Sequence, residues 1–224
     1  MTTKRFLSLE WKQFRRSSFF EKGLAIKIIM ILVALYFASI AILSGVGVFF
    51  ILEKAMPSQD PFLIINNYML YWVLGDLALR FFMQQLPVIN IKPMLLLPVK
   101  RKSVIQFLLL KTSFSFFNVL PLLFFLPLTI VLIVQGYQPL MTLLWFVSII
   151  AISFSINFLN FIFNKHTTAF FVVLSVLAST IALDYFGIFN LISYTGSVFY
   201  SFYDLGFTAL ISLLIVVFLF KVNA

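Results

Sequence analysis

The chain has 224 residues, of which 62% are hydrophobic and 10% charged, and its formal net charge is +9. An ordinary soluble domain carries roughly 25% charged residues, and much of any globule's surface stays exposed, so this composition excludes a water-soluble fold. With no cysteine, the chain has no disulfide, thiol nucleophile or cysteine-bound metal. The positive charge is attributed to orientation of membrane helices, and no nucleic-acid partner is expected.

The first segment, residues 1–23, is predicted to form an amphipathic helix at the membrane interface. Leu7, Trp11 and Phe14 fall on one helical stripe, whereas most of the cations lie on the other side. Such a helix lies flat, with aromatic rings in the headgroup region and cations near anionic lipid. Two interpretations stay open: a plain topology anchor, or a cytoplasmic elbow that transmits motion from a partner.

Six apolar runs follow, and each is long enough to cross a bilayer as a helix. Transmembrane barrel strands would alternate apolar and polar residues over about 10 positions, which these runs do not. We therefore predict an all-α, polytopic membrane protein with one domain over residues 1–224, and its membrane part over 24–221. The third run is expected to be kinked by Pro121 and Pro127, and an aromatic connector is expected before the sixth. The predicted spans are 24–52, 62–84, 103–135, 140–163, 167–187 and 204–221, with the connector at 188–203.

The cations fall in every second gap between these runs. Seven lie in the segment that ends at Lys27, four lie in the loop 85–102, and Lys165 and Lys221 complete the set. The opposite side carries only Lys54. Because cytoplasmic loops carry an excess of Lys and Arg, the pattern predicts six spans with both termini in the cytoplasm.

The basic loop 85–102 combines an apolar patch with a cluster of cations. Proline restricts the residue before it to extended conformations, so the loop is expected to be structured, and Ser103 is the predicted N-cap of the next helix. One interpretation is orienting charge beside incidental apolar residues, and the other is a docking surface for a cytoplasmic protein. The residues that define this surface are Pro93, Leu97, Pro98, Lys100, Arg101 and Lys102.

Polar side chains inside the predicted spans form a second group of candidates. Asp76 and Arg80 are four residues apart, so they share a helix face and can pair. Intramembrane ionisable residues are functional candidates, and this pair has either a structural role or a role in gating or a substrate pathway. Three amides, Asn118, Asn157 and Asn160, are expected to bond between helices. Asp184 and Asp204 flank the expected outer connector, within either an interfacial aromatic belt or an exit gate.

The order of these parts resembles the permease subunits of ABC-2-type transporters. The stretch Phe6–Arg15 is similar to their elbow helix, and Leu97–Ser103 is similar to the loop that precedes their third span. The resemblance implies a cytoplasmic ABC ATPase docked at loop 85–102, which would bind the ATP, and a second permease copy or paralogue. It also implies the bacterial inner membrane, an export function, and short re-entrant helices near 188–203.

The chain is also similar to the N-terminal half of a longer family of uncharacterised bacterial permease-like proteins, which is consistent with a truncated or split protein. We find no phosphate-binding loop, HExxH or GxSxG motif, and the only histidine is His166. No catalytic residue, metal site or cofactor is therefore predicted in this chain. The main alternative to a permease is a membrane scaffold or assembly factor; a channel, a transporter not driven by ATP and an intramembrane enzyme stay open.

Overall fold

The computed structural model describes residues 12, 24–84, 101–187, 190–205 and 208–223, and these ranges are helical with no β-strand among them. Most residues of the predicted docking surface, together with Trp11 and Phe14, lie outside the described part of the chain. The helices are α3 (Leu24–Ala55), α4 (Pro61–Asn67), α5 (Met69–Met83), α7 (Arg101–Ser113), α8 (Phe116–Val134), α9 (Pro139–Lys165), α10 (Thr167–Tyr185), α11 (Leu191–Asp204) and α12 (Thr208–Asn223).

Several of these helices are long and apolar enough to cross a membrane, which confirms the all-α class. Four segments meet this criterion alone: Ile28–Ala55, Ile105–Val134, Pro139–Lys165 and Thr167–Tyr185. Two bent pairs bring the number to as many as six if each pair is one span: α4 with α5, bent by 43°, and α11 with α12, bent by 103°.

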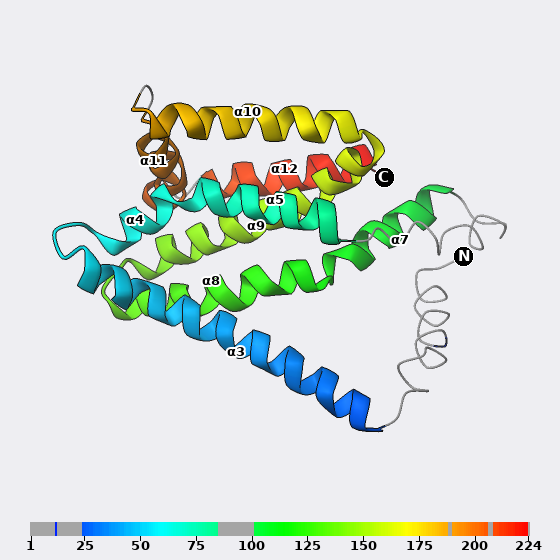
Figure 1. The fold of residues 1–224 in the computed structure, drawn as a ribbon, viewed down its shortest axis with the longest axis horizontal. Helices are drawn as coiled ribbons and strands as arrows, with labels where there is room; N and C mark the ends of the chain where they lie inside the picture. The colour runs from blue at the N-terminus through cyan, green and yellow to red at the C-terminus, as the bar shows by residue number, and fades with distance from the viewer. Residues whose placement is uncertain (1–11, 13–23, 85–100, 188–189, 206–207, 224) are drawn as a thin grey trace.

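Helix α9 is the centre of the bundle. It contacts α5, α7, α8, α10, α11 and α12, while α3 packs obliquely on α8 (Figure 1). Its buried positions include large apolar side chains such as Trp145 and Ile149, together with serines and asparagines. A membrane helix with such buried polar groups requires hydrogen-bond partners, and Asn66 of α4, Arg80 of α5 and Thr112 of α7 supply them.

The second predicted span is divided into α4 and α5 at Tyr68. Helix α4 begins with proline at its first position, and the Asp60 carboxylate accepts a hydrogen bond of 2.9 Å from the Phe62 amide as an N-cap. Proline at the first position and an aspartate cap are typical helix-starting features. The span predicted over 62–84 is therefore not one continuous helix. It consists of two helices that together have the length of one span.

The third predicted span is interrupted at Phe114–Ser115, between α7 and α8. Pro121 and Pro127, the expected kink sites, both lie inside α8. Helix α7 begins at Arg101, so Ser103 lies within the helix and is not its N-cap, contrary to prediction. The interruption is stabilised by the Asn118 side chain of α8, which donates to carbonyls at the end of α7.

The predicted tight turn between α8 and α9 is present. Gly136 has φ +97°, and the Tyr137 amide donates to the Leu132 carbonyl over 3.2 Å. The Gly136 amide bonds to the Ile133 carbonyl over 3.2 Å, so the two bonds form a Schellman motif, which requires a left-handed residue after the helix.

The segment 188–203 differs from the expected connector, because most of it forms α11. This helix crosses the end of the bundle at a steep angle to α12 (Figure 1). Its Gly196 lies against α4: a Cβ there would be 1.7 Å from the Asn67 side-chain oxygen. The aromatic content that suggested a connector is instead used for packing, because Phe199 is buried in the main core and Tyr200 and Tyr203 pack against it.

An aromatic cluster fixes α4, α9, α11 and the α8–α9 turn to one another at this end. The fully buried Phe62 ring lies at its centre, with ring centroids of neighbouring side chains at 5.1 to 5.6 Å. Three of these contacts are edge-to-face and the one with Tyr200 is tilted; an edge-to-face pair adds about 0.5–1.5 kcal/mol beyond simple burial. The neighbours are Tyr137, Trp145, Tyr200 and Tyr203.

Helix α3 can pack closely on α8 because it carries glycine at position 45. A Cβ at Gly45 would lie 2.2 Å from the backbone oxygen of Phe124, whereas one at Gly47 would lie 3.9 Å from its closest neighbour, Ile51. Small residues commonly permit such close approach of membrane helices.

We expect Gly45→Ala to lower the thermal unfolding temperature in detergent, because the added methyl displaces α3 from α8 at a cost of about 1–3 kcal/mol. The matched variant Gly47→Ala adds the same methyl in the same helix, where space exists, and its greater helix propensity should leave stability unchanged or slightly higher. Equal unfolding temperatures for the two variants would contradict the proposed close contact.

Candidate functional site

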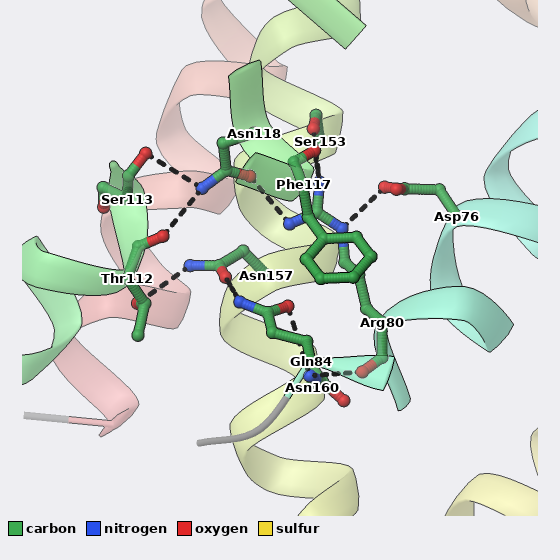
Figure 2. Close-up of polar contacts among 10 residues, drawn as sticks. All are labelled: Asp76, Arg80, Gln84, Thr112, Ser113, Phe117, Asn118, Ser153, Asn157 and Asn160. Atoms are coloured by element: carbon green, nitrogen blue, oxygen red, sulfur yellow. Dashed lines mark hydrogen bonds and ion pairs between the residues drawn. The ribbon is translucent and has the colours of Figure 1, made fainter. Parts of the chain in front are cut away.

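Two ladders of polar side chains face each other inside the apolar bundle. Asp76 and Arg80 on α5, and Gln84 at its C-cap, recur every four residues, and such positions share one helix face. On α9 the partners lie at Ser153, Asn157 and Asn160, and additional groups come from the α7–α8 junction (Figure 2). We call these ten residues the Arg80 network: Asp76, Arg80, Gln84, Thr112, Ser113, Phe117, Asn118, Ser153, Asn157 and Asn160.

The Arg80 side chain is the centre of this network and is fully buried. Its Nε donates to Asp76 over 2.8 Å, and its Nη1 donates to the Asn118 side-chain oxygen over 2.7 Å. Its Nη2 donates to the Phe117 carbonyl over 2.8 Å and to the Ser153 hydroxyl over 2.9 Å. The guanidinium carbon also lies 6.0 Å from the Phe117 ring centroid, within reach of a cation–π interaction.

The Phe117 carbonyl is available to Arg80 because of a proline. In a regular helix this carbonyl would accept from the amide of residue 121, but residue 121 is Pro121, which has no N–H. An unpaired carbonyl in an apolar environment is costly. Arg80 Nη2 supplies the missing donor from another helix, so the proline and the arginine satisfy each other's requirements.

Asn118 has a similar double role at the α7–α8 junction. Its side-chain oxygen accepts from Arg80, while its Nδ2 donates to the carbonyls of Thr112 and Ser113, each over 3.1 Å. Those carbonyls lie in the last turn of α7, where the regular helical donors are missing, and the Thr112 carbonyl also accepts from the Ser115 amide over 3.0 Å. Asn118 therefore caps the broken helix and connects the break directly to the buried guanidinium.

The network continues from Arg80 toward the end of α5. Gln84 Nε2 donates to Asn157 Oδ1 over 2.8 Å, and Asn157 Nδ2 donates to the Thr112 hydroxyl over 3.2 Å. Asn160 Nδ2 lies 3.3 Å from the Arg80 carbonyl and 3.4 Å from Gln84 Oε1. Side-chain amides thereby link α5, α7 and α9 through interhelical hydrogen bonds, which are common between membrane helices.

This arrangement can hold and orient the Arg80 guanidinium charge inside the bundle. Asp76 and three uncharged groups accept hydrogen bonds from Arg80, so the buried cation is paired. No group of three His, Cys, Asp or Glu side chains that could hold a metal occurs within the described ranges. The network holds no arrangement of a nucleophile with a base.

The structure thus brings Asp76 and Arg80 together and joins them to the three asparagines proposed for contacts between helices. Sequence reasoning did not identify Gln84, Ser153 or Thr112 as members of the network. A signal for Gln84 was present, because it continues the four-residue spacing of Asp76 and Arg80. Ser153 precedes Asn157 at the same spacing on α9.

The other sequence candidates lie elsewhere. Arg101 and Lys102 form the start of α7, and the remaining residues of the docking surface lie outside the described part of the chain. Asp184, at the end of α10, accepts a hydrogen bond of 3.4 Å from the Ile192 amide. Asp204 borders a polar pocket of about 350 Å³ between α4 and α11, together with Asn67.

A second polar contact lies at the end of the bundle beneath α11. The Tyr137 hydroxyl donates to the Asp60 carboxylate, and the Gln138 amide donates to the Tyr203 hydroxyl over 3.3 Å. Burial raises the pKa of the Tyr137 phenol above its usual range, and the bond to Asp60 raises it further. The phenol therefore stays protonated and fixes the α8–α9 turn to the start of α4.

These features define an all-helical protein with membrane-length apolar helices and a buried, arginine-centred polar network. A family model described as "Family of unknown function (DUF5687)" matches residues 10–224, and the chain belongs to this family. No curated protein and no solved structure matches the chain.

We expect Arg80→Met to destabilise the fold strongly, because it leaves buried acceptors on several helices unpaired; breaking a buried pair of this kind typically costs about 3–5 kcal/mol. Adding Pro121→Ala should recover about 1–3 kcal/mol of that loss, since the new residue brings a backbone N–H for the Phe117 carbonyl. The measurement is a double-mutant cycle on unfolding in detergent.

The matched control combines Arg80→Met with Pro127→Ala, which supplies an amide to a different carbonyl in the same helix. This pair should be additive. If both alanine substitutions restore stability equally, the gain comes from general helix propensity, and the assigned bond between Arg80 and Phe117 is wrong.

Proposed function

We propose that this chain is the membrane-spanning permease subunit of an ATP-driven, ABC-2-like exporter of a bacterial inner membrane. In this proposal α4 with α5 makes one span and α12 makes the sixth, with α11 lying before it between the fifth and sixth spans. Residues 1–23 form the interfacial elbow helix, and both termini lie in the cytoplasm. A separate ABC ATPase docks at loop 85–102, and a second permease copy or paralogue completes the pathway.

The observation that carries this proposal is α11. The resemblance to ABC-2 permeases calls for short helices between the fifth and sixth spans, and α11 occupies that interval with a 103° bend to α12. Apolar sequence alone would be compatible with a plain loop there. A helix that crosses the end of the bundle is a feature that a generic six-helix protein does not need.

The positions of the helix ends also support the proposed topology. The start of α7, the α9–α10 turn and the end of α12 lie at one end of the bundle (Figure 1). The loop after α3, the α8–α9 turn and the end of α10 lie at the other. The first group carries Arg101, Lys165 and Lys221, as expected for a cytoplasmic side.

The Arg80 network offers a route from the docking loop to the membrane helices. Helix α7, described from Arg101 onward, includes the last two residues of the predicted loop 85–102, and its last turn is capped by Asn118. Asn118 also accepts from Arg80 of α5. A displacement of α7 by a docked ATPase would therefore act on α5 and α8 through hydrogen bonds, as in coupling by small shifts of packed helices.

The same network also favours the alternative of a membrane scaffold without transport activity. Arg80 is completely buried and bonded to four acceptors, an arrangement suited to holding helices in one fixed relation. A scaffold would need no ATPase, so the two functions differ in their partners.

The topology is testable directly because the chain has no cysteine. We expect a single cysteine from Ser58→Cys to react with a membrane-impermeant maleimide in intact cells, because residue 58 is exposed and on the proposed outer side. His166→Cys, exposed at the opposite end, should react only after permeabilisation. Labelling of both cysteines in intact cells would contradict the six-span topology.

The docking proposal predicts that Lys100→Glu/Arg101→Glu abolishes co-purification of the ATPase from native membranes in mild detergent. The reason is that carboxylates replace the cations beside the apolar patch of the docking surface. The matched control Lys165→Glu/His166→Glu places two carboxylates in the other proposed cytoplasmic turn and should leave the association intact.

Maleimide labelling of Ser58→Cys in each background verifies that insertion is unchanged. Recovery of the unmodified chain without any phosphate-loop ATPase, or unchanged association after charge reversal in the loop, would sink the coupling proposal. The first of these outcomes would favour the scaffold.

A further inference from the structure

An apolar groove runs along the bundle between α7, α9 and α12. Its volume is about 790 Å³, within the range of roughly 300–1,000 Å³ of small-molecule sites. Each helix contributes residues spaced along one face, so the groove follows the helix axes. The lining residues are Gln106, Leu110, Ser113, Phe114, Phe154, Phe158, Val216, Val217, Phe220 and Lys221.

The groove has a polar end and an apolar end. Gln106 lies near the start of α7 and Lys221 lies in the last turn of α12, at the same end of the bundle as Phe158. Two contacts of Phe158 place it beside the end of α12. Its carbonyl accepts from Asn223 over 3.3 Å, and its ring centroid lies 5.6 Å from that of Phe220.

The deep end offers no comparable polar group among the described residues that line it. Its hydroxyl, on Ser113, donates to the Leu109 carbonyl of its own helix over 3.1 Å. Phe114, at the α7–α8 break, is 88% exposed, and Phe154 lines the groove from α9. An occupant that fits therefore has a polar, anionic head at Lys221 and a long apolar tail toward Phe114.

We propose that this groove binds one anionic phospholipid of the bilayer, with its phosphate at Lys221 and an acyl chain along α7 and α12. The groove borders segments of membrane-spanning length, so its immediate solvent is lipid. Its described lining includes no acidic side chain, so the charge of Lys221 is complementary to a phosphate. The proposal rests on membrane insertion alone and holds for a transporter or a scaffold.

The test places a tryptophan reporter at the deep end with Phe114→Trp, a substitution at a highly exposed aromatic site. The protein is reconstituted into vesicles of phosphatidylcholine with a minor fraction of phosphatidylglycerol, and either lipid carries brominated acyl chains. We expect about fivefold stronger quenching per mole of brominated phosphatidylglycerol than of brominated phosphatidylcholine, since one cation near the membrane surface contributes about that preference. Signal from the native tryptophans is subtracted with the unmodified protein.

Two controls isolate the groove. Phe82→Trp reports an exposed position at similar depth on α5, near the level where Gln84 meets Asn157 and Thr112, and it should show no headgroup preference. Lys221→Gln should remove the preference at position 114, whereas Lys165→Gln removes a charge from the same side and should preserve it.

Equal quenching by the two lipids at position 114, with Lys221 in place, would overturn the proposal. So would a reporter that neither lipid quenches, because the groove would then be covered by protein, either another segment of this chain or a second copy. A preference that survives Lys221→Gln would likewise contradict the assignment of the phosphate to this lysine.

Discussion

The structure depends on the requirement that a charge inside an apolar bundle must be paired. Arg80 is completely buried, and burying an unpaired cation would cost several kcal/mol. Its donors are therefore satisfied from three other places: Asp76 on the same helix, the start of α8, and Ser153 on α9. Because hydrogen bonds tolerate little error in distance and angle, this single side chain restricts how α5, α8 and α9 lie relative to one another.

The need to pair Arg80 also explains two irregularities of the backbone beside it, the α7–α8 break and Pro121. Both interrupt the regular hydrogen bonds of the helix, and lipid cannot replace the missing donors. Asn118 donates to the carbonyls at the break, and Arg80 donates to Phe117, the carbonyl that the proline leaves free. The charged group and the backbone defects thus stabilise one another. A helix that begins at a basic loop is in this way connected to the interior of the bundle, whether the connection transmits motion or only provides rigidity.

The two ends of the bundle are built from different chemistry. At the end capped by α11, the fully buried Phe62 ring is enclosed by aromatic side chains, and the Tyr137 hydroxyl is bonded to Asp60. At the other end α7 and α12 leave an apolar groove with Lys221 at its rim. Aromatic rings pack tightly at the first end, beside a small polar pocket of about 350 Å³, whereas the groove at the other end leaves apolar surface that the surrounding lipid can fill.

The sequence by itself determined the all-α class and the approximate positions of the apolar segments, because continuous hydrophobicity over about 20 residues is a local property. It also predicted the contact between Asp76 and Arg80, since a spacing of four residues fixes neighbours on a helix. Only the tertiary structure decided that Arg80 bonds to Phe117 and Ser153, which are 37 and 73 residues away along the chain. The same holds for the packing of α11 on α4 and α9, because these partners are distant from it in the sequence. Periodicity shows which face of a helix is polar, but the identity of the opposing helix depends on contacts across the folded chain.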